Sequence, residues 1–238
     1  ALSLQPSSII VLKDGREYNG KLISIKEDKV LFMVDGLLNF FNREDVLKIN
    51  LQKSRRYEYL KNILDIEDNE IKEIWQNSLA TNLDDTNQSQ NSSFVVLLDK
   101  TTYDFKDKQN VTIRLKRAIK ILTEDGKDES IQYFYYLKKY FTPNLLYAMS
   151  VTEDGNLYPV SESAINDEPI NGSYPIYDNL QRVKFGLKNG DIGTTIIWEC
   201  EINGSFNELD NPFFTTKQLI NSYPSKKKIV EVVYPKDM

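Results

Sequence analysis

The 238-residue sequence predicts a mainly β protein: a small N-terminal antiparallel barrel, a short helical connector and a C-terminal β-sandwich. Both ends of the chain contain short apolar or alternating segments separated by Asp-Gly and Asn-Gly turns, as in antiparallel strands. Between them, apolar residues recur every three or four positions, which is the helical period. Residues 81–93 hold one apolar residue in thirteen, as expected of a linker. We therefore expect a barrel at 1–53, a connector at 54–83, a linker at 84–93 and a sandwich at 94–238.

The barrel prediction depends on five short strands separated by tight turns, which is typical of a small and strongly bent sheet. The turn signals are Asp14-Gly15, Glu27-Asp28 and Asp35-Gly36. The expected strands cover residues 9–13, 18–25, 30–34, 37–41 and 46–51.

Three short motifs of this region are Leu12-Lys13-Asp14-Gly15, Gly20-Lys21-Leu22 and Arg43-Glu44-Asp45-Val46. Their order resembles the small Sm-like barrels of bacterial envelope proteins. Some Sm-like barrels bind RNA, but the sequence pI near 5.0 and the lack of an arginine cluster argue against nucleic acid here.

The connector is expected to form two helices with one apolar stripe. Asp68 or Asn69 is placed to cap the second helix, with Glu70 and Glu73 near its positive end. The stripe would pack on the barrel or bridge it to the next domain. Its members are Tyr57, Leu60, Ile63, Leu64, Ile71, Ile74, Trp75 and Leu79.

From Phe94 onward the strand signal returns and continues to the end of the chain, with little sign of helix. In residues 111–121, apolar side chains alternate with Thr112, Arg114, Lys116 and Lys120, which predicts a half-buried strand with a polar face. Regular spacing with Gly-containing turns indicates an antiparallel β-sandwich. The expected strands cover residues 94–98, 111–121, 131–141, 145–151, 183–187, 192–202 and 229–234.

Several strand ends and turns of this second half recur in one order. They are Lys120-Ile121-Leu122-Thr123-Glu124-Asp125-Gly126, then Ala148 with Thr152-Glu153-Asp154-Gly155, Tyr177-Asp178, residues 183–187 with Gly190-Asp191, and Pro212-Phe213-Phe214 with Tyr223-Pro224. This order resembles a bacterial domain of unknown function that stands directly before transglutaminase-like domains in exported proteins. The resemblance covers residues 94–235 and implies an all-β sandwich, an extracytoplasmic location and no catalytic residues within the domain. Lys188-Asn189 departs from the proline that the family usually has before the Gly-Asp turn.

Composition excludes several kinds of chemistry. The chain has no histidine and a single cysteine, so Ser–His–Asp and Cys–His catalysis, histidine-ligated metals and internal disulfides are ruled out. We expect no cofactor and no metal. The net charge is −5, and no apolar run is long enough to span a membrane. The first residue is Ala1, which leaves open whether a signal peptide was removed or the start was set by cloning.

Candidate site residues are few. Cys200 lies between two glutamates in an expected strand, which favours a buried or surface strand cysteine over a nucleophile. The acidic pairs at residues 124–125, 128–129 and 153–154 have the composition of hairpin turns more than of a calcium loop. Lys226-Lys227-Lys228 reads as the solvated start of a strand. The densest aromatic cluster supplies a possible ligand platform, consisting of Tyr133, Tyr135, Tyr136 and Tyr140.

Two functions follow from these observations. The first is a non-catalytic accessory region of an exported bacterial protein, which contacts its own downstream transglutaminase-like domain or an envelope protein or glycan. The residues after Tyr234 have the composition of a linker, so we expect the natural chain to continue past Met238. The alternative is a free-standing glycan-binding module that uses the aromatic platform. A histidine-free hydrolase with two carboxylates stays open, although no pair is singled out.

Overall fold

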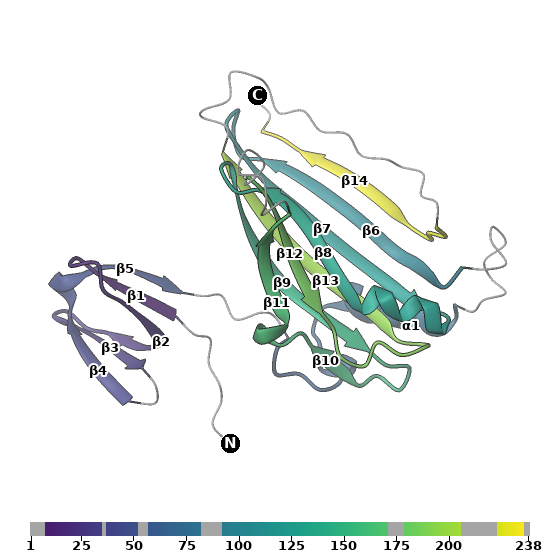
Figure 1. The fold of residues 1–238 in the computed structure, drawn as a ribbon, viewed down its shortest axis with the longest axis horizontal. Helices are drawn as coiled ribbons and strands as arrows, with labels where there is room; N and C mark the ends of the chain where they lie inside the picture. The colour runs from purple at the N-terminus through teal and green to yellow at the C-terminus, as the bar shows by residue number, and fades with distance from the viewer. Residues whose placement is uncertain are drawn as a thin grey trace. The chain divides into compact units, whose positions relative to one another are not determined.

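A computed structural model gives the fold (Figure 1) and describes residues 8–34, 37–51, 57–81, 92–170, 179–205 and 223–235. The chain is mainly β, as predicted, and divides into two units. We name Ala1–Arg56 the front unit and Tyr57–Met238 the rear unit. The predicted linker at 84–93 falls almost wholly outside the described residues, as do Asp35-Gly36, Tyr177-Asp178 and Pro212-Phe213-Phe214.

The front unit contains the five expected strands in one antiparallel sheet of order β4-β3-β2-β1-β5. Asp14-Gly15 turns the chain from β1 into β2, and Gly15 has a φ of +88°, a conformation that glycine adopts without strain. At Gly20 the backbone of β3 comes so close that a Cβ would lie 1.9 Å from the Met33 carbonyl oxygen. The bounds are β1 Ser8–Leu12, β2 Glu17–Ile25, β3 Lys29–Val34, β4 Leu37–Asn42, the 3-10 turn η1 Arg43–Asp45 and β5 Val46–Leu51.

The rear unit contains two sheets (Figure 1). The larger has the order β10-β9-β13-β7-β6-β14, and the smaller has the order β11-β12-β8. The large sheet is built from β6 Phe94–Phe105, β7 Asn110–Ile121, β9 Phe141–Val151, β10 Leu157–Pro159, β13 Thr195–Ser205 and β14 Lys228–Val233. The small sheet is built from β8 Ile131–Leu137, β11 Ile165–Pro169 and β12 Leu180–Gly186.

The central strands of the large sheet are covered on both faces. One face shares a core with the small sheet, in which Phe134 of β8, Phe185 of β12 and Trp198 of β13 pack together. The opposite face shares a second core with the connector, in which Ile71 and Ile74 pack with residues of β6, β7, β9 and β13. Burial on both faces explains why β13 is β-branched and apolar through Ile196 and Ile197, with no polar alternation there.

The connector differs from the two predicted helices. Over its described residues, 57–81, it forms one α-helix, α1 Asn69–Leu79, preceded by the short 3-10 turn η2 Ile63–Asp65. Asp68 caps α1, as one of the two expected residues, by accepting hydrogen bonds from the backbone N–H groups of Glu70 and Ile71. Tyr57 lies in a turn and Leu60 directly follows it, yet both pack against the second core. Their spacing therefore reflects contact with the sheet, and the apolar stripe packs on the large sheet of the rear unit.

Three further expectations are corrected, two of them at points where the chain changes sheet. Residues 131–141 are two strands, because the chain turns at Lys138–Tyr140 from β8 of the small sheet into β9 of the large sheet. The turn signal at Glu124-Asp125-Gly126 begins the 3-10 helix η4, Glu124–Ser130, which carries the chain from β7 to β8. Strand β6 continues to Phe105, well past the predicted end at residue 98. The predicted segment ended there because Asp99-Lys100-Thr101-Thr102 lacks an apolar pattern.

The last strand corrects the expectation of a wholly antiparallel region. Strand β14 pairs with β6 in parallel, with Ile229 opposite Lys100 and Val232 opposite Tyr103. Parallel pairing requires a long crossover, and 22 residues separate Ser205 at the end of β13 from Lys228 at the start of β14.

Candidate functional site

The aromatic cluster is divided by the alternation of β8. Tyr133 and Tyr135 point outward and are 49% and 47% exposed, whereas Tyr136 points inward and is 8% exposed. Tyr140 lies in the turn after β8 and is half-buried beside Lys139, whose ammonium lies 5.2 Å from its ring centroid. The structure thus brings together only two of the four tyrosines on one outer face.

Tyr136 has a structural role on the inner side of the small sheet. Its hydroxyl donates a 2.6 Å hydrogen bond to Oδ2 of Asp167 on β11, across the width of the sheet. Burial, together with this carboxylate, raises the pKa of Tyr136 above its usual range. Tyr136 therefore does not belong to an exposed platform.

We name the outward row of β8 and β12 the outer strip. Its exposed members on β8 are Ile131, Tyr133, Tyr135 and Leu137, and β12 adds Leu180, Arg182 and Lys184. The register places Arg182 opposite Tyr135 and Lys184 opposite Tyr133. Gly186, opposite Ile131, leaves open space where a side chain would stand.

Arg182 is the most constrained polar residue of the outer strip. Its Nε donates to Oε1 of Glu168 on β11 at 3.0 Å, and the same pair forms a second, ionic contact. The hydrogen bond to Glu168 raises the pKa of Arg182. Its guanidinium carbon also lies 6.0 Å from the ring centroid of Tyr133, within cation–π range. The rings of Tyr133 and Tyr135 are 5.3 Å apart and inclined by 61°, so they do not form a flat stacking surface.

The single thiol is inert in this fold. Cys200 is fully buried on the face of β13 that packs against the small sheet. Burial raises the pKa of Cys200, and the charges of Glu199 and Glu201 act in the same direction. Because the reactive form of cysteine is the thiolate, this position does not suit a nucleophile.

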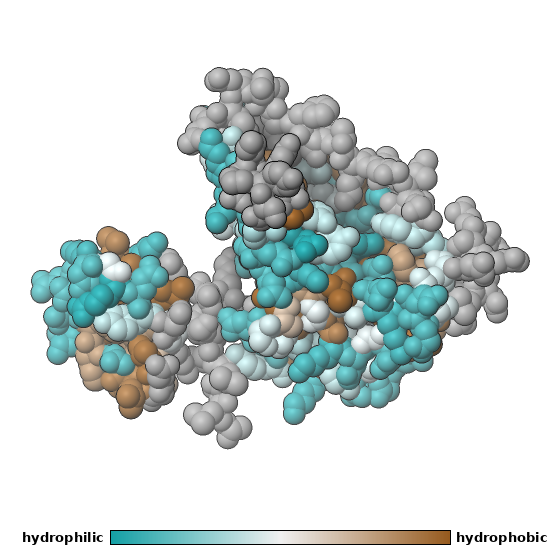
Figure 2. All heavy atoms as spheres, viewed as in Figure 1, coloured by the Kyte–Doolittle hydropathy of each residue, from teal (hydrophilic) through white to brown (hydrophobic). Residues whose placement is uncertain are grey.

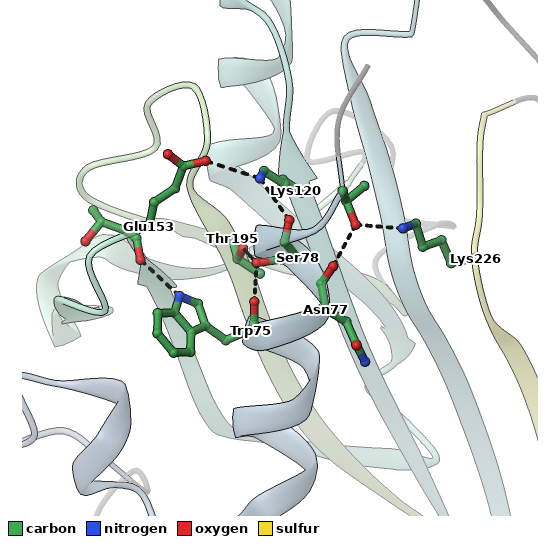
Figure 3. Close-up of polar contacts among 9 residues, drawn as sticks. Trp75, Asn77, Ser78, Lys120, Glu153, Thr195 and Lys226 are labelled. Carbon is green, nitrogen blue, oxygen red and sulfur yellow. Dashed lines mark hydrogen bonds and ion pairs between the residues drawn. The ribbon is translucent and has the colours of Figure 1, made fainter. Parts of the chain in front are cut away.

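A polar cluster that the sequence reading missed lies where α1 ends over the large sheet (Figure 3). Lys120, on β7, is 3% exposed, and its ammonium donates to the Ser78 carbonyl oxygen at 2.8 Å and to Oε1 of Glu153 at 3.2 Å. Thr195 donates to the Ser78 hydroxyl at 2.7 Å. Four residues earlier on the same face of β7, Lys116 is also buried and pairs with Glu70 in the first turn of α1.

This cluster resembles a serine–lysine dyad in composition but not in geometry. The Lys120 ammonium binds the backbone carbonyl of Ser78, and the Ser78 hydroxyl donates to the Trp75 carbonyl oxygen at 2.6 Å. No proton path joins the amine to the hydroxyl, and both groups are buried. Lys120 instead places a cation at the negative end of the helix dipole. Lys226 acts there as well, since its ammonium donates to the Thr81 hydroxyl, which in turn donates to the Asn77 carbonyl oxygen.

The remaining candidates do not form sites. Within the described ranges, no group of three or more Cys, Asp or Glu side chains is arranged to hold a metal ion. Asp154 accepts from Thr152 and Asn156 in its own turn, which lowers the pKa of Asp154. Two surface hollows have mixed lining. One of about 420 Å³ in the front unit includes Arg16, Tyr18 and Phe40, and one of about 390 Å³ beside α1 includes Glu73 and Lys227.

A comparison with models of known protein families found one match. The model of a domain of unknown function with a solved structure, DUF3857, matches residues 107–238. The chain belongs to this family. The DUF3857 match contains the outer strip, Cys200 and Lys120, but it begins inside the rear unit. Strand β6 and helix α1 precede it, although both complete the core of the same unit.

A solved structure resembles this chain in fold. A candidate protease from Parabacteroides distasonis superposes with a TM-score of 0.52 at 13% identity, covering 59% of this chain and 28% of its own. This chain thus spans little more than a quarter of that protein. The CBM3a-L domain of a Clostridium thermocellum cellulosome scaffoldin gives a TM-score of 0.30 at 12% identity, covering 53% of this chain and 79% of its own. This score is too low to indicate a shared fold. The comparison with curated proteins found no match.

Proposed function

We propose that this chain is a non-catalytic accessory region of a longer exported bacterial protein, and that a transglutaminase-like domain follows it. The DUF3857 match supports this reading, because the resemblance over residues 94–235 implies a domain that precedes such enzymes. The P. distasonis candidate protease adds support, since the part that resembles this chain is only 28% of that protein. In this reading the location is extracytoplasmic, the front unit is a closed Sm-like barrel and the two rear sheets form a β-sandwich.

The chemistry of the described residues supports a non-catalytic role. The thiol of Cys200 is buried, the chain contains no histidine, and Lys120 is directed to a backbone carbonyl. A transamidase or thiol protease needs an exposed thiolate with an imidazole partner. The chemistry would therefore belong to the domain that follows.

The single observation that carries the proposal is the outer strip. Its alternate side chains are exposed at 40–49% along β8, in a sheet whose inner face is already filled by core residues. Aromatic and arginine side chains are enriched at protein interfaces, and the strip combines both with aliphatic residues at its ends. We propose that the downstream domain packs on this strip.

Hydroxyl-radical footprinting of the natural full-length protein and of residues 1–238 tests this proposal. Tyr133 and Tyr135 should be oxidised less in the full-length protein, because the following domain covers them. Tyr59, which is 53% exposed in the connector, serves as the control and should be oxidised equally in both. Equal oxidation of Tyr133 and Tyr135 would overturn the docking surface. A reading frame that stops at Met238, or continues without Cys, His and Asp, would overturn the proposal as a whole.

A second candidate function is a free-standing glycan-binding module, which the shared outward face of Tyr133 and Tyr135 favours. It predicts retarded migration in gels that contain a cell-wall polysaccharide. The Tyr133→Ser/Tyr135→Ser variant should lose this retardation, while Tyr59→Ser keeps it. Unretarded wild-type protein would rule this function out for the polysaccharide used.

A further inference from the structure

We infer that the front unit docks on an anionic lipid surface through the outward face of the β3–β4 hairpin. We name this surface the hairpin face and define it by Leu31, Met33, Leu38 and Phe40. The inference concerns the front unit alone and does not depend on the function proposed above.

The hairpin face exists because two adjacent strands are apolar on both sides. The register places Phe40 opposite Leu31 and Leu38 opposite Met33, so these four side chains form a patch on the side away from the core. Phe40 is 62% exposed and Leu38 is 47% exposed. Figure 2 shows the corresponding brown spheres gathered on the part of the front unit where Figure 1 draws β3 and β4.

The core of the front unit does not account for these residues. Its fully buried members are Ile10, Leu12, Val30 and Phe32, and Tyr18, Leu22, Val34 and Phe41 pack around them. Phe41 points inward and contacts both Tyr18 and Phe32, whereas its neighbour Phe40 points outward. A strand on a solvated sheet face would carry polar residues at the outward positions. The outward leucines and phenylalanine therefore indicate an interaction surface.

Charge indicates the partner. Residues 1–56 contain ten Lys and Arg against seven Asp and Glu, a net charge of +3, whereas residues 57–238 contain 20 against 28, a net charge of −8. The net −5 of the whole chain conceals this separation. Such a distribution orients the front unit toward a negatively charged surface.

Individual contacts agree with the net charge. Lys26, Lys29, Arg43 and Lys48 are exposed and form no ion pair within the part of the front unit that the structure describes. Two of the acids are engaged locally, since Asp14 pairs with Arg16 and Asp45 accepts from Asn42, while Glu17, Glu27, Asp28 and Glu44 form no ion pair among the described residues. The hydrogen bond to Arg16 also lowers the pKa of Asp14. Of the unpaired cations, Lys29 begins β3 and Arg43 follows β4, so both lie at the ends of the hairpin strands.

Peripheral membrane binding combines two contributions. Apolar side chains enter the interface between headgroups and acyl chains, and cations contact acidic headgroups. A second copy of the chain is less suited as the partner, because it would bring two units of net +3 together. A sugar polymer is less suited as well, because the patch is aliphatic and offers few hydrogen-bonding groups. Within the described residues, no helix could cross a bilayer, so the contact would lie at the membrane surface.

Cosedimentation of the full chain with vesicles tests the inference. The probes are vesicles of phosphatidylcholine mixed with phosphatidylglycerol, and vesicles of phosphatidylcholine alone. We expect sedimentation with the mixed vesicles, weaker sedimentation with the neutral ones, and loss of binding as salt is raised. The Leu38→Ser/Phe40→Ser variant should bind at least about tenfold more weakly, because two buried apolar side chains are removed.

The matched control is Leu64→Ser/Tyr59→Ser, which removes a leucine and an aromatic residue of similar exposure, 63% and 53%, from the rear unit. It should bind like the wild type. The inference is overturned if the wild type does not sediment with mixed vesicles, or if the hairpin variant binds as well as the control. Concentration-dependent dimerisation that the hairpin variant abolishes, without vesicle binding, would assign the hairpin face to self-association instead.

Discussion

Replacing Gly126 by alanine should destabilise the rear unit, because this glycine has no room for a side chain. It lies in η4, where the chain leaves the large sheet for the small one. An added Cβ would stand 2.1 Å from the Ser93 carbonyl oxygen. That oxygen accepts hydrogen bonds from the backbone N–H groups of Leu122 and Thr123, at 2.9 and 3.1 Å.

The structure gives the size of the effect. The clash displaces Ser93 and costs both hydrogen bonds, about 0.5–1.5 kcal/mol each. Displacement of the backbone adds a cost of about 1–2 kcal/mol, in the range known for local backbone strain. The lower entropy of unfolded alanine returns less than about 1 kcal/mol. The expected net loss is about 2–3 kcal/mol, or roughly 5–10 °C in Tm for a unit of this size.

Tryptophan fluorescence during denaturation provides the assay. Both tryptophans, Trp75 and Trp198, lie in the rear unit, so their fluorescence follows its unfolding alone. Gly186→Ala is the control, since a Cβ there meets nothing within 4 Å, and it should stay within about 1 kcal/mol of the wild type. A Gly126→Ala protein as stable as the control would refute the packing argument.

Three further predictions concern the thiol, the helix cap and the linker. Cys200 should resist iodoacetamide at pH 8 and react fully in denaturant, because burial raises its pKa; rapid labelling of the native protein would contradict this. Asp68→Ala should cost about 1 kcal/mol by the same fluorescence assay, because α1 loses its cap, and unchanged stability would count against this role. A broad-specificity protease should cut first within residues 81–93, as their composition predicts, and an earlier cut in a strand would disprove this.

Local signals in the sequence were reliable at two turns and over helix α1, where the structure depends on neighbours along the chain. Asp14-Gly15 and Glu153-Asp154-Gly155 form the predicted turns, and Gly15 and Gly155 both have φ values that favour glycine, +88° and +84°. The apolar period over α1 and its acidic cap were also readable, because a helix is closed by contacts between residues three and four apart.

The alternation of side chains along β8 could be predicted from the sequence, but the exposure of each face could not. The sequence shows that Tyr133 and Tyr135 share one face and Phe134 and Tyr136 the other. Which face is exposed depends on where the large sheet lies, and its strands come from distant parts of the chain. The position of Tyr140 could not be predicted either. The chain passes from one sheet to the other at the end of β8, but its sequence there has the aromatic composition of one continuous strand.

The polar face of β7 shows most clearly that tertiary structure determines whether a face is exposed. Lys116 and Lys120 alternate with apolar residues, so the sequence predicts a half-buried strand whose polar face meets water. In the structure α1 covers that face, and the two lysines bind Glu70 near its beginning and the Ser78 carbonyl at its end. Alternation records only which side chains share a face. Whether water or a helix lies over that face depends on residues some 40 positions away, whose charges and carbonyls satisfy a buried ammonium only after the chain has folded.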